Sequence, residues 1–191
     1  MALWRGATDL LGKALSYPVY SVSLGYNVLR NAWDPENYRW YDVIDEHLIL
    51  GAVPTQAIVE QLVVDRRLGT VINLTKHFDG TSIDYQQLQV DHVRVEVLDF
   101  TRPSSEQTRE ILEVIQRTAA RGKTTYVHCK AGRGRGAYIA LWWMMRRNPT
   151  KTPQEVQAML LEKRGQVVKN LYQDEAVLKF HSSLASMEEA Q

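Results

Sequence analysis

The most informative stretch of the sequence is Thr125-Tyr126-Val127-His128-Cys129-Lys130-Ala131-Gly132-Arg133-Gly134-Arg135-Gly136-Ala137. It contains the single cysteine of the chain, with a histidine directly before it and an arginine six positions after it. An apolar β-type run leads into the stretch, and a second apolar run follows it at 138–145. This order predicts a strand, a tight glycine-rich turn and the start of a helix. Such a turn directs successive backbone N–H groups at one point, and the dipole of the helix strengthens its attraction for anions.

Cys129 lies at the mouth of this predicted anion-binding loop. A thiolate at a helix N-terminus near an arginine is a competent nucleophile at neutral pH. Arg135 can hold a phosphate with two parallel hydrogen bonds, which a lysine cannot do. The stretch therefore predicts a phosphate-binding loop with a nucleophile inside it. Two other interpretations are a buried structural cysteine and a dinucleotide-binding turn, but the glycines follow G-x-G-x-G and not G-x-G-x-x-G.

A thiolate that cleaves a phosphate ester needs a second group, which protonates the leaving oxygen. Asp99 is the best candidate, because it follows an alternating run at 92–98 that predicts a strand with one exposed side. Sites in α/β sheets gather at the carboxyl ends of strands. Asp91 is the second candidate, but it precedes the same strand and is expected at the opposite edge of the sheet. A loop-capping aspartate is the alternative interpretation of Asp99.

The segment from His128 to Arg135 resembles the signature loop of the cysteine-dependent phosphatases, within the dual-specificity branch. Trp40-Tyr41-Asp42 and Leu48-Ile49-Leu50-Gly51-Ala52-Val53-Pro54 resemble the mitochondrial PTP-like lipid phosphatases, the phosphatidylglycerophosphatases of cardiolipin synthesis. The resemblance implies a phosphatase that hydrolyses phosphate monoesters through a phosphocysteine intermediate. Its implied substrate is phosphatidylglycerophosphate, and a phosphoinositide or a phosphoprotein is the alternative.

The resemblance also implies the role of each site residue. Cys129 is the nucleophile, Arg135 binds the phosphate, and Asp99 is the acid, at a separation closely similar to that in the family. The phosphate-binding positions between them are Lys130, Ala131, Gly132, Arg133 and Gly134. His128 is expected to order the loop and not to transfer protons. We expect no metal and no other cofactor, because no His, Cys and Asp cluster has metal-ligand spacing.

One position departs from the family. Serine or threonine usually follows the signature arginine, where its hydroxyl steadies the thiolate as it leaves phosphocysteine, and this chain has Gly136 there. Gly134 also replaces a common serine. Slow turnover, or a phosphate-binding pseudophosphatase, is therefore a second hypothesis. Glycine at 136 has an alternative, backbone explanation in a positive φ or close packing at the helix start.

Extra cations surround the predicted nucleophile. Lys130 and Arg133 suit a polyanionic or membrane-bound substrate, and Arg102, Lys76 and Lys169 are candidates to extend this basic patch. The family usually has an arginine near the position of Lys169. The expected partner is an anionic phospholipid or another phosphorylated substrate.

The totals describe one ordinary globular domain. The 191 residues are 45% apolar, which is enough for a full core. The 23 basic and 22 acidic residues give no reason to expect nucleic-acid binding. A single cysteine excludes an internal disulfide framework and suits a reducing compartment. We expect a monomer.

Strands that alternate with helices predict an α/β fold, a single domain with a central, mostly parallel twisted sheet flanked by helices, as in dual-specificity phosphatases. The expected strands span 40–44, 47–52, 70–74, 92–98 and 124–128. The expected helices span 54–66, 104–121, 136–147, 152–163 and 173–184. Capping boxes are expected at Ser104 with Gln107 and at Thr152 with Glu155.

The first thirty residues differ from the rest. They are acid-poor and amphipathic, as mitochondrial targeting segments and interfacial anchors are. Their uncharged run at 14–29 is shorter than the roughly 20 residues that span a bilayer. We divide the chain into this segment (1–30), a linker (31–38), the catalytic domain (39–186) and a tail (187–191). The expected location is the mitochondrial inner membrane, peripherally bound. The alternative location is the cytoplasm. The alternative interpretation of residues 1–30 is a helix that packs on the flank of the domain.

Overall fold

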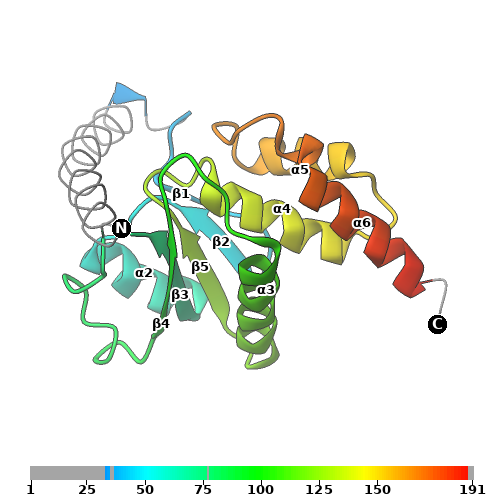
Figure 1. The fold of residues 1–191 in the computed structure, drawn as a ribbon. Coiled ribbons are helices and arrows are strands. Elements are labelled where there is room, and N and C mark those ends of the chain that lie inside the picture. The colour runs from blue at the N-terminus through cyan, green and yellow to red at the C-terminus, as the bar shows by residue number, and fades with distance from the viewer. Residues whose placement is uncertain (1–32, 35–36, 77, 189–191) are drawn as a thin grey trace, which may run out of the picture. The chain divides into compact units, whose positions relative to one another are not determined.

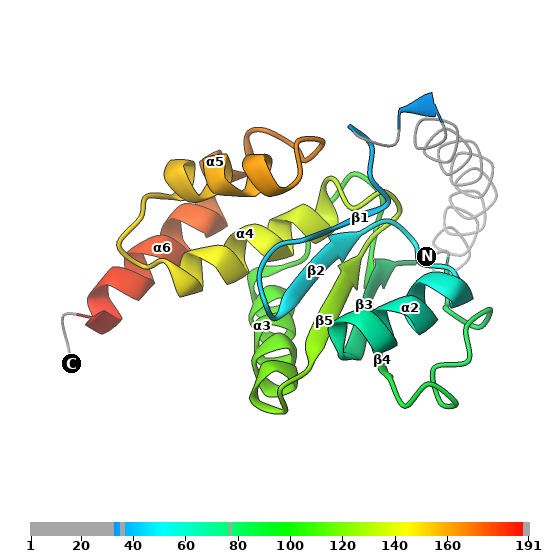
Figure 2. The same cartoon turned by 180° about the vertical axis from the view of Figure 1, so that it is seen from behind.

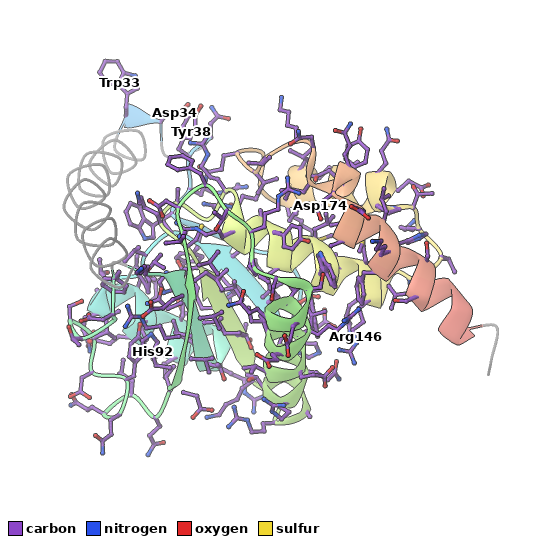
Figure 3. All side chains as sticks on the ribbon, viewed as in Figure 1. Trp33, Asp34, Tyr38, His92, Arg146 and Asp174 are labelled. Carbon is purple, nitrogen blue, oxygen red and sulfur yellow. The ribbon has the colours of Figure 1, made fainter. Side chains whose placement is uncertain are left out.

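The computed structural model describes residues 33–34, 37–76 and 78–188. The chain divides into two compact units, Met1–Arg39 and Trp40–Gln191. In the first unit the backbone N–H and the side-chain amide of Asn37 both donate to Asp34, and the labelled side chain of Trp33 is exposed (Figure 3). The predictions for residues 1–30 lie outside the described part of the chain, and the division into four segments stays a prediction.

The second unit is built on one sheet (Figure 1). Its strands are β1 (Tyr41–Val43), β2 (Leu48–Gly51), β3 (Leu68–Thr75), β4 (Asp91–Val97) and β5 (Thr124–His128). They lie in the order β1-β2-β5-β3-β4. Only β1 runs antiparallel to its neighbour, and the other three pairs are parallel. This confirms the predicted mostly parallel sheet.

Helices cover both faces of the sheet (Figures 1 and 2). They are α2 (Gln56–Arg66), α3 (Ser105–Ala120), α4 (Arg135–Arg147), α5 (Pro153–Lys163) and α6 (Glu175–Glu188), with a short 3-10 turn η1 (Leu171–Gln173). α2 packs on one face, and α3 and α4 pack on the other, while α5 and α6 pack against α4. The labelled side chain of Arg146 joins α4 to α3 through an ion pair of 2.8 Å with Glu113 (Figure 3).

Two apolar cores follow from the alternation of side chains along the strands. In β2, Leu48 and Leu50 join the core under α3 and α4, and Ile49 joins the core under α2. In β5, Val127 and Tyr126 divide in the same way. The central strands β3 and β5 are buried along their whole length, as expected for strands covered on both faces.

Helix starts follow local capping. Both predicted capping boxes are present, at the starts of α3 and α5. α2 begins two residues after the predicted position, because Thr55 is its N-cap and its hydroxyl accepts a hydrogen bond of 3.3 Å from the N–H of Ile58. The last predicted helix is present as α6, which begins two residues after the predicted position and follows the turn η1.

Candidate active site

The glycine-rich stretch connects β5 to α4 at the carboxyl edge of the parallel strands. Its residues from Cys129 to Gly134 are called the phosphate loop below. Gly132 has a φ of +63°, and a Cβ added there would lie 2.4 Å from the carbonyl oxygen of Gly51. A side chain at 132 is therefore excluded both by the backbone conformation and by the neighbouring strand.

Cys129 is a free cysteine with 4% of its surface exposed. Burial by itself raises the pKa of its thiol. The positive charge of Arg135 and hydrogen bonds from the backbone N–H groups of Gly136, Ala131 and Gly132 outweigh that effect, so the pKa lies below its usual value. The loop thus stabilises a thiolate, and the same donors are placed to hold the oxygens of a phosphate.

Arg135 is the first residue of α4 and is buried. Its Nη1 donates to the carbonyl oxygens of Val97, at 2.8 Å, and Leu74, at 3.2 Å. These carbonyls lie at the carboxyl ends of β4 and β3. The edge of the sheet therefore fixes the guanidinium, while Nη2 lies 2.6 Å from Oδ1 of Asp99.

Asp99 lies in the loop after β4 and contacts both the phosphate loop and the start of α4. Besides the contact with Arg135, its Oδ2 accepts a hydrogen bond of 2.6 Å from Nζ of Lys130, a largely buried lysine. The structure therefore brings Asp99 together with the loop that contains Cys129. Asp91 begins β4, and its ion pair of 2.8 Å with Arg121 lies at the other end of that strand. The geometry favours Asp99 over Asp91 as the acid.

His128 is completely buried, and its Nδ1 lies 3.3 Å from the carbonyl oxygen of Cys129. Burial lowers the pKa of His128 to about 3. The imidazole is therefore neutral near neutral pH. This agrees with a role in ordering the loop and gives no support to proton transfer by His128.

The two glycines that depart from the family differ in their surroundings. Gly134 is the N-cap residue of α4, and a Cβ there would meet nothing within 4 Å. At Gly136 a Cβ would lie 3.9 Å from Sγ of Cys129 but only 2.8 Å from Cδ1 of Leu50. The φ of Gly136 is not positive. Of the two backbone explanations for this glycine, close packing holds and a left-handed conformation does not.

The basic residues near the loop have different partners. Nε of Arg133 donates to the carbonyl oxygen of Gln166 at 3.1 Å. Arg102 pairs with Asp174, and its guanidinium lies 5.5 Å from the ring centre of Tyr138. Asp174, labelled in Figure 3, also accepts a hydrogen bond of 3.1 Å from the Tyr138 hydroxyl. Arg102 is therefore charge-paired within the domain, whereas Lys169 is exposed.

Sequence reasoning gave no role to Arg164, which has 1% of its surface exposed. It donates to the carbonyl oxygens of Gly132, at 2.9 Å, and Ala131, at 3.0 Å, and pairs with Asp42 at 2.7 Å. Carbonyls held outward in this way leave the N–H groups of the loop directed inward. In the sequence, Arg164 resembles an ordinary cation at a helix end. The one signal was its partner Asp42, which lies in the stretch that carries the family resemblance.

No group of three or more His, Cys, Asp and Glu side chains is placed to hold a metal ion in the described part of the chain.

The catalytic domain of the dual specificity phosphatases matches residues 48–183 of this sequence. The chain belongs to the dual specificity phosphatase family. The phosphatidylglycerophosphate phosphatase PTPMT1 of Arabidopsis thaliana is 36% identical over 182 residues, which cover 93% of this chain and 51% of the relative. The chain therefore spans about half the length of that curated relative.

Solved structures show the same fold. A crystal structure of PTPMT1 superposes with a TM-score of 0.70 at 23% identity and covers 80% of this chain and 100% of its own. A second crystal structure, of PTPMT1 in complex with PI(5)P, has a TM-score of 0.68 at 22% identity and covers 78% of this chain and 99% of its own. The predicted family and fold are confirmed for this dual specificity phosphatase. The roles of its individual site residues stay predictions.

Proposed function

We propose that this dual specificity phosphatase hydrolyses phosphate monoesters through a phosphocysteine intermediate, with phosphatidylglycerophosphate as its substrate. The observation that carries the proposal is the environment of Cys129. A buried thiol whose pKa is lowered by Arg135 and by three backbone N–H groups is a nucleophile inside a ready-made phosphate site.

In the first step the Cys129 thiolate attacks phosphorus, and the bond between phosphorus and the leaving oxygen breaks. The backbone N–H groups of the phosphate loop and the Arg135 guanidinium hold the other three oxygens, where negative charge is spread. A phosphate oxygen that binds Nη2 of Arg135 takes the place of Oδ1 of Asp99. The displaced carboxyl group, in its protonated form, gives its proton to the leaving oxygen.

In the second step water attacks the phosphocysteine, and Asp99 accepts a proton from that water. The bond between phosphorus and sulfur breaks, and the electron pair returns to Cys129 as thiolate. Inorganic phosphate is the product. Thiolate is the leaving group only in this step, so the N–H groups around the sulfur favour it directly.

The substrate follows from the relatives and from the charge of the site. PTPMT1 of Arabidopsis thaliana is named a phosphatidylglycerophosphate phosphatase. Lys130 and Arg133 add positive charge to a loop that already has Arg135, which suits a lipid headgroup with more than one anionic group. A phosphoinositide is the second candidate, because a structural neighbour is in complex with PI(5)P. A phosphoprotein and a pseudophosphatase of low turnover are the further alternatives.

The proposed location is the mitochondrial inner membrane, with the protein bound at the surface as a monomer. Its support is the acid-poor, amphipathic composition of residues 1–30 and the family resemblance. None of the described helices combines the length and the apolar character that a membrane crossing requires.

The test is phosphate release by the purified full chain from phosphatidylglycerophosphate, a phosphoinositide and a phosphotyrosine peptide, with a chelator present. We expect the highest kcat/KM for phosphatidylglycerophosphate. The Cys129→Ser variant should release no phosphate from any of the three substrates. A rate that depends on added divalent metal, or one that survives Cys129→Ser, would contradict the mechanism. A higher kcat/KM for another substrate would contradict only the substrate.

A further inference from the structure

Exposed apolar side chains gather around the phosphate loop. The large hydrophobic residues that are exposed in the described part of the chain are Trp33, Val64, Leu98, Phe100, Val168 and Leu178. Three of them, Leu98, Phe100 and Val168, lie in two segments that contact the phosphate loop directly. Single exposed hydrophobic residues are common and need no explanation, but a cluster beside a site marks an interaction surface.

Contacts hold both segments at the mouth of the loop. Leu98 and Phe100 flank Asp99, whose carboxylate lies 2.6 Å from both Nζ of Lys130 and Nη2 of Arg135. On the other segment, the N–H of Val168 donates to the carbonyl oxygen of Arg133 at 2.9 Å. The two segments that carry these three exposed residues therefore both lie next to the phosphate loop, although they are about 70 positions apart in the sequence.

Phe100 is the most unusual of the three, with 95% of its surface exposed and a φ of +63°. A bulky residue rarely adopts this left-handed conformation, which glycine and asparagine tolerate. The domain thus holds an aromatic side chain in water at the tip of the loop that carries Asp99, at a cost in backbone strain. Strained, exposed positions of this kind occur at functional sites.

Positive charge lies beside the apolar side chains. Lys169 follows Val168 and is exposed, and Arg133 is partly exposed on the phosphate loop itself. Apolar side chains flanked by cations bind at the surface of an anionic bilayer, where the apolar groups enter the acyl boundary and the cations meet the headgroups. A soluble phosphopeptide would use the cations but would leave Phe100 in water.

We propose that Leu98, Phe100 and Val168, with Lys169, form an interfacial rim that inserts into the surface of an anionic lipid bilayer and brings the phosphate loop to the headgroups. The rim lies within the catalytic domain and is distinct from residues 1–30. The inference rests on the proposed function, because the rim would bring the phosphate loop to a lipid substrate that is still embedded in a membrane.

The test compares the full chain with its Phe100→Asn variant. Asparagine tolerates the φ of this position, so the backbone around Asp99 is expected to remain in place. Val64→Gln is the matched control, because Val64 is 80% exposed but lies on α2, away from the phosphate loop. The readouts are sedimentation with phosphatidylcholine vesicles that contain phosphatidylglycerol, and turnover of a soluble aryl phosphate.

We expect Phe100→Asn to weaken vesicle binding by about 10-fold, because the variant has no large apolar side chain to bury in the bilayer. Turnover of the aryl phosphate should be unchanged, and Val64→Gln should behave as the natural protein in both assays. Equal vesicle binding by the natural protein and Phe100→Asn would overturn the proposal. An equal loss of aryl phosphate turnover would also overturn it, because Phe100 would then act on Asp99 and not on a membrane.

Failure of the rim and failure of the proposed substrate are distinguishable. Vesicle binding needs no hydrolysis, so the rim stands if Phe100→Asn loses binding while phosphatidylglycerophosphate is not hydrolysed. Conversely, suppose that the protein hydrolyses a short-chain, monomeric form of that lipid while Phe100→Asn has no effect on vesicle binding. That result supports the proposed substrate and contradicts the rim.

Discussion

Replacing Gly136 with serine tests whether the missing hydroxyl limits turnover. A Cβ at this position lies 3.9 Å from Sγ of Cys129, so a hydroxyl on it comes within hydrogen-bonding reach of the sulfur. A hydrogen bond to a charged group contributes about 1.5–3 kcal/mol, which corresponds to about 10 to 150-fold in rate. Because thiolate leaves only when phosphocysteine breaks down, the gain should appear in that step and not in phosphocysteine formation.

Leu50 sets the cost of the same substitution. Its Cδ1 would lie 2.8 Å from the new Cβ, and Leu50 is completely buried. Overpacking of this kind costs about 1–3 kcal/mol of folding stability. Gly136→Ser should therefore lower the free energy of unfolding, and Leu50→Val in the same chain should recover part of the loss, because valine is one carbon shorter and has no Cδ1 atom at the contact.

Rapid-quench kinetics with an aryl phosphate separates the two chemical steps. The natural protein should release a burst of leaving group and then a slow steady rate. In Gly136→Ser, alone or with Leu50→Val, the steady rate should rise while the burst rate stays nearly constant. If the natural protein shows no burst and both steps are slower in the two variants, the missing hydroxyl does not limit turnover and Gly136 is a packing residue only.

Four further expectations follow from the site. Asp99→Asn should slow hydrolysis of a substrate with a poor leaving group by about 10²–10⁴-fold without unfolding the domain, and near-normal rates would mean that the acid is another residue. Arg164→Met should lower the free energy of unfolding by about 3–5 kcal/mol in urea titrations, because it removes the buried 2.7 Å ion pair with Asp42. The folded-state pKa of His128, about 3, lies below the usual value of about 6.5, so stability should fall as the pH drops from about 6.5 toward 3, by up to about 1.4 kcal/mol per unit, and His128→Asn should flatten that slope. A chain that starts at Asn31 should turn over aryl phosphate normally but sediment less with anionic vesicles, whereas misfolding of that chain would place residues 1–30 in the core.

The parts of the fold that the sequence could predict are those governed by neighbours in the chain. The strand, loop and helix around Cys129 are contiguous, and their glycines, apolar runs and single cysteine are all visible in one stretch. The capping boxes of α3 and α5 depend on residues three positions apart. Asp99 was predictable as a candidate because its place after a strand puts it at the catalytic edge of any parallel sheet.

The parts that could not be predicted depend on packing between distant segments. Arg164 reaches Asp42 across 122 positions of sequence, and no local pattern distinguishes it from a solvated cation at a helix end. The proposed rim depends on the same kind of information, since the N–H of Val168 donates to Arg133 across 35 positions of sequence. The sequence could not tell why residue 136 is a glycine. The structure shows a packing reason, because a Cβ at this position would lie 2.8 Å from Cδ1 of Leu50.

Asp99 is expected both to donate the proton and to compete with phosphate for the cations of the site. Its carboxylate lies 2.6 Å from both Arg135 and Lys130, which are also the cations that a phosphate would use. We expect phosphate binding to displace the carboxylate from Arg135 and to turn Asp99 toward the leaving oxygen. An asparagine at 99 removes the competing charge together with the acid. The loss of rate in Asp99→Asn should consequently be accompanied by tighter binding of inorganic phosphate, a combination that simple damage to the loop would not produce.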